Sequence, residues 1–164
     1  MFANMSRSSI ALAAALGLGL ALSACAHNNP ENLAAGYGAA GPGSVQEFNQ
    51  TVGDRVFFDT DQTDLSQTAQ ATLDKQAAWL NQYNKYSFTI EGHADERGTR
   101  EYNFALGSRR AQAVHDYLVA KGVSASRMRT ISYGKERPVA VCDDISCWSQ
   151  NRRAVTVLNG AASS

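Results

Sequence analysis

Regular patterns of hydrophobic and polar residues begin at about residue 51 and predict a globular domain at 51–160. Apolar residues dominate 54–58, which predicts a short strand before the turn-rich sequence DTDQTD. Apolar residues then recur every three or four positions over 65–83, which predicts a helix with Ser66 as a possible cap. Alternating apolar and polar residues at 86–91 predict a half-buried strand.

The second half of this domain repeats the alternation of element types. Apolar residues from Leu106 to Leu118 predict one face of a second helix, and Gly122 suits a left-handed stop after it. Two further strands are expected at 129–133 and 153–158, which gives the order βαβαββ. Two helices on one face of a mixed sheet bury these apolar faces economically, so the predicted fold is α+β, a two-layer α/β sandwich.

Residues 1–24 have the pattern of a secretory signal peptide. Arg7 is the only charge before Glu31, and residues 10–22 form an apolar run. A helix needs about 20 apolar residues to cross a bilayer, so this run is too short to be a stable transmembrane segment. Its length and flanks fit a signal that is removed from the mature chain.

The signal ends in the sequence LSAC, which resembles the lipobox of bacterial lipoproteins. In those proteins the signal is cut before the cysteine, which then carries lipid, so Cys25 is the expected lipidation site. Several acyl chains on Cys25 would anchor the protein stably on a membrane. Ala26 rather than Asp follows, which resembles the pattern of release to the outer membrane.

Residues 25–50 contain few large apolar side chains and many Asn, Gly, Ala and Pro residues. Such a segment buries too little apolar surface to offset the entropy lost on ordering. We therefore expect the lipidated cysteine to be followed by a flexible tether that ends at residue 50.

The charge balance excludes a strong attraction to nucleic acid or anionic lipid, because 15 basic residues face 15 acidic ones. The tandem pairs Arg109-Arg110 and Arg152-Arg153 are typical of solvated faces.

The sequence contains no recognisable catalytic centre. Three histidines occur, and only His93 and His115 fall in the predicted domain. The sequence contains neither an HExxH motif nor a paired CxxC motif, so it does not indicate a zinc site. The nucleophile elbow G-x-S-x-G is also missing, which argues against a serine hydrolase.

The DTDQTD turn is a weak candidate for calcium. Asp59, Asp61 and Thr63 match positions one, three and five of an EF-hand-like loop, but Asp64 replaces its glycine and Gln70 its final glutamate. Acidic turns of this kind usually serve as caps and Asx-turns.

Cys142 and Cys147 have four residues between them in the sequence CDDISC. In an oxidising compartment such a pair favours a disulfide, and free thiols are the alternative. The bond would require a non-helical turn, because the two Cα atoms must approach within about 7 Å.

Asp95 follows a predicted strand, and Arg110 lies in the first half of the helix after it, so the chain can bring them together. A carboxylate beside a guanidinium suits a zwitterion, because Asp binds an ammonium and Arg binds a carboxylate through paired hydrogen bonds. The alternative is that the two side chains simply pair with each other.

The sequence EGHADERGTREYNFALGSRRAQAVHDYL, with ISYGKERPVA and WSQNRRAV after it, closely resembles the peptidoglycan-associated lipoproteins and the wider family of OmpA-like C-terminal domains. The resemblance spans residues 54–158. It implies an α/β sandwich that binds the diaminopimelate residue of the peptidoglycan stem without catalysis and without a cofactor. By motif position, Asp95 would meet the ammonium of the ligand and Arg110 its carboxylate. The positions that would line the pocket are Asn103, Leu106, Phe58, Asp59 and Thr60.

The resemblance also implies partners. Proteins of this family bind TolB and work with other Tol-system proteins in envelope integrity and cell division, with the domain facing the periplasm. A protein that serves mainly as a scaffold for TolB is the alternative, because wall and TolB would use the same loops. The sequence departs from the family at Arg100, where Pro is common, and in the CDDISC segment.

Overall fold

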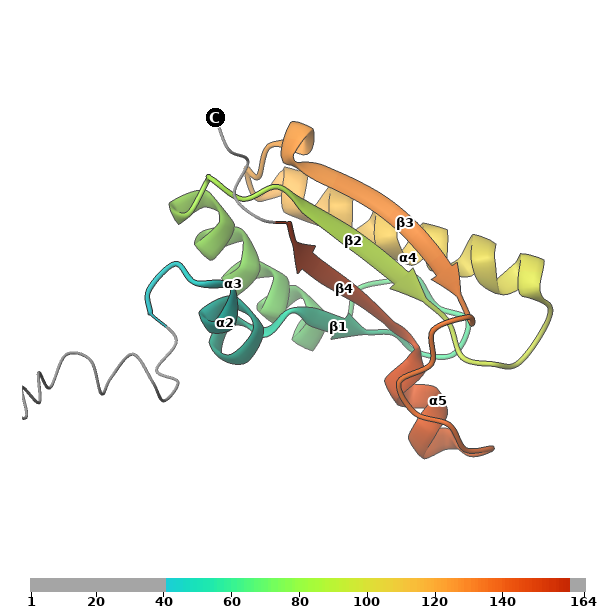
Figure 1. Ribbon diagram of the computed structural model, residues 1–164. Coiled ribbons are helices and arrows are strands. Elements are labelled where there is room, and N and C mark those ends of the chain that lie inside the picture. Colours follow the sequence, from blue (N-terminus) through green and yellow to red (C-terminus); the bar gives the residue numbers. More distant parts are fainter. Residues whose placement is uncertain (1–40, 160–164) are drawn as a thin grey trace, which may run out of the picture. The chain divides into compact units, whose positions relative to one another are not determined.

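The computed structural model describes residues 41–159 (Figure 1). The predicted signal peptide, Cys25 and the tether up to residue 40 lie outside the described residues.

One four-stranded sheet organises the domain, with the strand order β1-β4-β2-β3. Strand β2 pairs in parallel with β3, and the β1–β4 and β2–β4 pairs are antiparallel, so the predicted mixed sheet is confirmed. The strands are β1 (Arg55–Phe57), β2 (Phe88–His93), β3 (Met128–Gly134) and β4 (Arg153–Leu158).

Helices α3 (Gln67–Gln82) and α4 (Arg100–Ala120) match the two predicted helices. The Ser66 hydroxyl accepts a hydrogen bond from the backbone N–H of Ala69 at 3.2 Å, which is the predicted cap. After α4, Gly122 has a φ of +87°, a conformation in which glycine avoids the strain of a side chain.

Both helices cover the same face of the sheet (Figure 1). From α3, Gln76 accepts a hydrogen bond from Thr156 of β4 at 2.9 Å. From α4, Gly107 lies so close to Gly92 of β2 that a Cβ atom at Gly92 would overlap the Gly107 carbonyl oxygen. Thr156 and Gly92 point to one face, because Thr156 pairs with Ile90, two residues from Gly92.

The boundary predicted for the tether is wrong, because the chain already packs into the domain before residue 51. Val45–Glu47 form helix α2, and Phe48–Gly53 form the π-helical segment η1. The Phe48 side chain is fully buried, with its ring 4.9 Å from that of Trp79. Composition missed this docking because it depends on Trp79 and Tyr86, which contact Phe48, Glu47 and Gly43 from far along the chain.

Two further short helices are absent from the sequence prediction. They are η2 (Ala125–Arg127) and α5 (Ile145–Asn151), and α5 lies where the chain passes from β3 to β4 (Figure 1). Helix α5 is too short to show an apolar period, although Asp144 caps it by accepting a hydrogen bond from the Ser146 N–H at 2.7 Å. Within residues 41–159 no helix has the length and apolar character needed to cross a membrane.

Candidate ligand-binding site

The predicted site residues gather where β1 and β2 end and β4 begins. Asp95 follows β2 in the loop before α4, and Arg110 projects from α4. The turn after β1 contributes Phe58, Asp59 and Thr60. The fold therefore brings the two central residues and the DTD turn to one end of the sheet.

Asp95 is the acidic centre of this end, and its side chain is 9% exposed. Its carboxylate accepts hydrogen bonds from the Arg97 backbone N–H, Nε and Nη2, at 3.2, 3.0 and 2.7 Å. A fourth comes from Nη1 of Arg152 at 3.4 Å. Burial raises the pKa of Asp95, but the hydrogen bonds from Arg97 and Arg152 lower it by more, so the net pKa lies below its usual value.

Arg110 is fully buried, and its guanidinium donates hydrogen bonds to backbone carbonyl oxygens rather than to a carboxylate. Its Nε, Nη1 and Nη2 donate to the carbonyl oxygens of Gln62, His93 and Asp59 at 2.9, 2.9 and 3.0 Å. Burial, and then the charge of Arg152, lower the pKa of Arg110 to about 10, so it remains a cation at neutral pH.

The possibility that Asp95 and Arg110 pair directly with each other is wrong. Within residues 41–159, no hydrogen bond or salt bridge joins them, and the cations on Asp95 are Arg97 and Arg152. Arg110 instead fixes the turn after β1 against the end of β2, which shapes the walls around Asp95.

The tandem arginines do not lie on solvated faces as predicted, apart from Arg109, which is exposed. Arg152 and Arg153 are 6% and 4% exposed. Arg152 donates Nε to the Phe58 carbonyl oxygen at 3.0 Å, and Arg153 donates Nη2 to that of Arg137 at 3.1 Å. Backbone carbonyls make these burials possible, because both guanidinium groups find hydrogen-bond acceptors, although within residues 41–159 the Arg153 Nε has none.

Two pockets at this end of the sheet are lined by predicted site residues. A polar pocket of about 220 Å³ is lined by Thr60, Asp61, Asp95, Arg97, Gly98 and Tyr102. A larger one of about 650 Å³ includes Phe58, Asp59 and Arg152 in its lining. Arg152, which lines the larger pocket, also contacts Asp95, which lines the smaller one.

The seven predicted ligand residues thus divide into three groups. Thr60 and Asp95 line the small pocket, and Phe58 and Asp59 line the larger one. Asn103, Leu106 and Arg110 are buried and line neither of these two pockets.

Asn103 supports the loop that carries Asp95. Its side-chain amide donates to the Arg97 carbonyl oxygen at 2.7 Å and is almost fully buried. Leu106, at 3% exposure, lies one turn further along the same helix. Both side chains therefore belong to the frame of the site.

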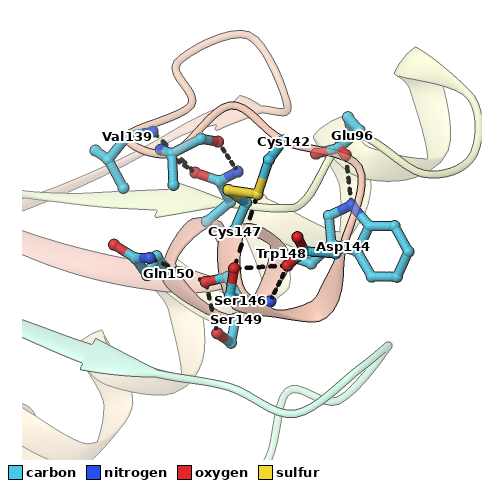
Figure 2. Close-up of a disulfide and its surroundings, with 11 residues drawn as sticks. Glu96, Val139, Cys142, Asp144, Ser146, Cys147, Trp148, Ser149 and Gln150 are labelled. Atoms are coloured by element: carbon cyan, nitrogen blue, oxygen red, sulfur yellow. Dashed lines mark hydrogen bonds between the residues drawn. A yellow bond between two sulfur atoms is a disulfide. The ribbon is translucent and has the colours of Figure 1, made fainter.

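Sequence reasoning missed two residues that contact the Asp95 loop. The Arg97 guanidinium lies 4.2 Å from the centroid of the Trp148 ring. The Trp148 indole N–H donates to Glu96 (Figure 2). Arg97 stands two positions after Asp95 in the GHADERGT motif, and Trp148 begins WSQNRRAV. The charge pattern around Asp95 could have indicated Arg97, whereas nothing in the sequence places Trp148 beneath it.

Cys142 and Cys147 form a disulfide, with their Cα atoms 5.6 Å apart (Figure 2). The expected non-helical turn holds only for Cys142, since Cys147 lies within α5. The bend at residues 142–144 provides the approach that a helix alone would not. The described part of the chain contains no group of His, Cys, Asp and Glu residues that could hold a metal ion.

Comparison with known proteins identifies relatives over most of the chain. The model of the OmpA family matches residues 57–153. The peptidoglycan-associated lipoprotein of Rhizobium meliloti is 66% identical over 154 residues, which are 91% of this chain and 88% of that protein. The protein of the same description from Brucella melitensis is 61% identical over 163 residues, 96% of each chain.

Solved structures show the same fold. The crystal structure of the peptidoglycan-associated lipoprotein from Burkholderia pseudomallei matches with a TM-score of 0.65 and 40% identity, covering 68% of this chain and 96% of that one. The C-terminal domain of Helicobacter pylori MotB matches with a TM-score of 0.62 over 66% of this chain and 86% of that domain. Its identity is 20%, so this second likeness concerns the fold alone.

Proposed function

The chain belongs to the OmpA family and, within it, to the peptidoglycan-associated lipoproteins, and we propose that its domain binds the diaminopimelate-containing stem peptide of peptidoglycan. Membership of this family makes the domain a binding protein and not an enzyme. The observation that supports the proposed ligand is the nearly buried Asp95 carboxylate in a small polar pocket, with Arg97 and Arg152 beside it.

The chemistry of this pocket suits the zwitterionic end of diaminopimelate. The Asp95 carboxylate would receive the ammonium of the ligand, because its lowered pKa keeps it ionised at neutral pH. The ligand carboxylate would lie toward the arginines. For Arg110 to meet the ligand carboxylate, the turn at 59–62 would move aside, and the N–H groups now on the Asp59 and Gln62 carbonyl oxygens would turn to the ligand.

The full chain would connect two layers of the cell envelope. In this proposal, residues 1–24 are removed, Cys25 carries the lipid that holds the protein in the outer membrane, and the following segment lets the domain reach the wall from the periplasmic side. The same domain would bind TolB within the Tol-Pal system, with a role in envelope integrity and cell division. Competition between TolB and the wall would then switch the connection on and off.

Sedimentation with purified peptidoglycan tests the proposed site. We expect Asp95→Ala to lose about 2 to 5 kcal/mol of binding free energy, because the ligand ammonium loses its desolvated partner. Asp116→Ala is the matched control, since Asp116 is an exposed acid on α4. Equal sedimentation of wild type and Asp95→Ala would show that the wall binds elsewhere.

A scaffold for TolB is the second candidate, and an exposed aliphatic surface supports it. Val139, Val141 and Ile145 are 53%, 87% and 61% exposed around the disulfide, where a protein partner could cover them. If this surface binds TolB, the double variant Val141→Ser, Ile145→Ser should lose TolB in a pull-down and keep its wall binding. Unchanged TolB capture would remove this surface from consideration.

A further inference from the structure

We propose that Arg97 determines which ligands reach Asp95, by occupying the carboxylate and yielding it only to a ligand that carries both an ammonium and an anionic group. This inference rests on the proposed function and deepens it. It makes Arg97 a specificity-determining residue for a zwitterion over a simple amine.

The Asp95 carboxylate has no acceptor position left. A carboxylate offers about four lone-pair sites, and four donors already use them. Oδ1 accepts from the backbone N–H and the Nε of Arg97, and Oδ2 accepts from Nη2 of Arg97 and Nη1 of Arg152. A ligand ammonium must therefore displace a donor before it binds Asp95.

Arg97 is the donor that can leave. Its side chain is 40% exposed, whereas that of Arg152 is 7% exposed. Arg152 also donates to the Phe58 carbonyl oxygen at 3.0 Å, so its release would leave a buried acceptor unpaired. The hydrogen bonds of the Arg97 side chain go to Asp95 alone among the residues that the structure describes.

The displaced guanidinium has a resting place beside the ligand. Trp148 lies under it at 4.2 Å, and an aromatic face attracts a cation. Trp148 is itself held by its hydrogen bond to Glu96 and by its place in α5, next to the disulfide (Figure 2). Arg97 therefore stays at the small pocket as a cation without its counter-ion.

Two other acids lie near Arg97, but neither accepts a hydrogen bond from its guanidinium, and each accepts one from another residue. Glu96 accepts the indole N–H of Trp148, and Asp61 accepts the Tyr102 hydroxyl at 3.2 Å. A lysine side chain would replace the guanidinium on Asp95 and leave Arg97 with only the weaker attraction of Asp61 and Glu96. The zwitterionic end of diaminopimelate carries a carboxylate on the same carbon as its ammonium. The ammonium would bind Asp95 while the carboxylate binds the displaced Arg97.

Calorimetric titration of residues 26–164 with two stem peptides tests this exchange, one with diaminopimelate and one with Lys in its place. We expect the wild type to prefer the diaminopimelate peptide by about tenfold or more, and Arg97→Gln to prefer it by less than about threefold. The change should come mainly from tighter binding of the Lys peptide, because the competing cation is gone.

Arg100→Gln is the matched control, because it removes an equal charge from an exposed arginine three residues away that pairs with Glu136. We expect it to keep the wild-type preference. An unchanged preference in Arg97→Gln, or an equal change in both variants, would overturn the role of Arg97 and leave the proposed function standing. Failure of the wild type to bind either peptide would overturn both.

Discussion

The two ends of strand β2 are built from different chemistry. Tyr86 stands before the strand, with its ring 5.4 Å from that of Trp79, and the Trp79 ring lies 4.9 Å from that of Phe48. Asp95 stands after the strand among Arg97 and Arg152. We call these the aromatic end and the charged end.

Each end contains an arginine that donates hydrogen bonds to three backbone carbonyl oxygens. Arg127 donates to the carbonyl oxygens of Leu80, Tyr83 and Tyr86 at the aromatic end, as Arg110 does to three carbonyls at the charged end. An arginine that ties backbone together is therefore a structural feature of this fold. What distinguishes the charged end is an acid whose counter-ion, Arg97, faces solvent.

Arg110→Ala is expected to have the largest effect on stability, because it leaves three carbonyl oxygens without their donor. We expect a loss of about 4 kcal/mol in the free energy of unfolding, measured by urea denaturation. Arg109→Ala, at the exposed neighbour, should change it by less than about 0.5 kcal/mol. Equal losses would contradict the structural role of Arg110.

Phe48→Ala tests whether the aromatic end is purely structural. We expect it to lower the free energy of unfolding by about 3 kcal/mol, because a fully buried ring is lost, while wall binding at pH 7 stays unchanged. Val45→Ala is the control, since Val45 is 41% exposed. Loss of wall binding by the folded Phe48→Ala protein would break the distinction between the two ends.

Removing the disulfide at the charged end should lower the free energy of unfolding by less than either of these two substitutions. The double variant Cys142→Ser, Cys147→Ser closes no loop in the unfolded chain, so we expect it to lose about 2 kcal/mol of stability. Wild type denatured with a reductant should give the same value, and the variant should be insensitive to reductant. A stability equal to that of oxidised wild type would mean that α5 is held by its other contacts alone.

Replacing His93 should have the smallest effect on stability at neutral pH and a larger effect in acid. Burial, followed by the charges of Arg153, Arg137 and Arg55, lowers the pKa of His93 from 6.5 to about 4, although Glu91 lies 3.7 Å away. The unfolded chain takes up this proton at a higher pH than the folded chain does. Stability should therefore fall as pH decreases from 6.5 to about 4, and level off below.

His93→Gln should flatten this part of the stability curve. The ring signals of His93 in NMR spectra of the wild type should likewise show no titration until well below pH 6.5. A midpoint near 6.5 would mean that the ring is solvated in the folded chain.

The sequence predicted the elements whose apolar period is regular, and it failed where one or two side chains decide. Strand β4 and the Ser66 cap occur as predicted, because alternation and capping are local properties. The docking of Phe48 and the helix α5 depend on contacts with distant residues, which a local pattern does not contain.

The charged end shows the same division. Residue type and position indicated Asp95, the resemblance to the family indicated the turn after β1, and the structure brings them to one place. The burial of Arg110 and Arg152 could not be inferred, because the carbonyl oxygens that accept their N–H groups become available only when strand ends meet. Tandem arginines on a surface and in a core look alike in sequence.

In the proposed function the charged end, and not the aromatic end, binds the peptidoglycan stem. The most direct test is an NMR titration of ¹⁵N-labelled residues 26–164 with the diaminopimelate stem peptide. We predict that the amide signals of Thr60, Asp61 and residues 95–98 shift, while those around Phe48 and Trp79 stay in place. Shifts centred on the aromatic end, or no shifts at saturating peptide, would contradict the account.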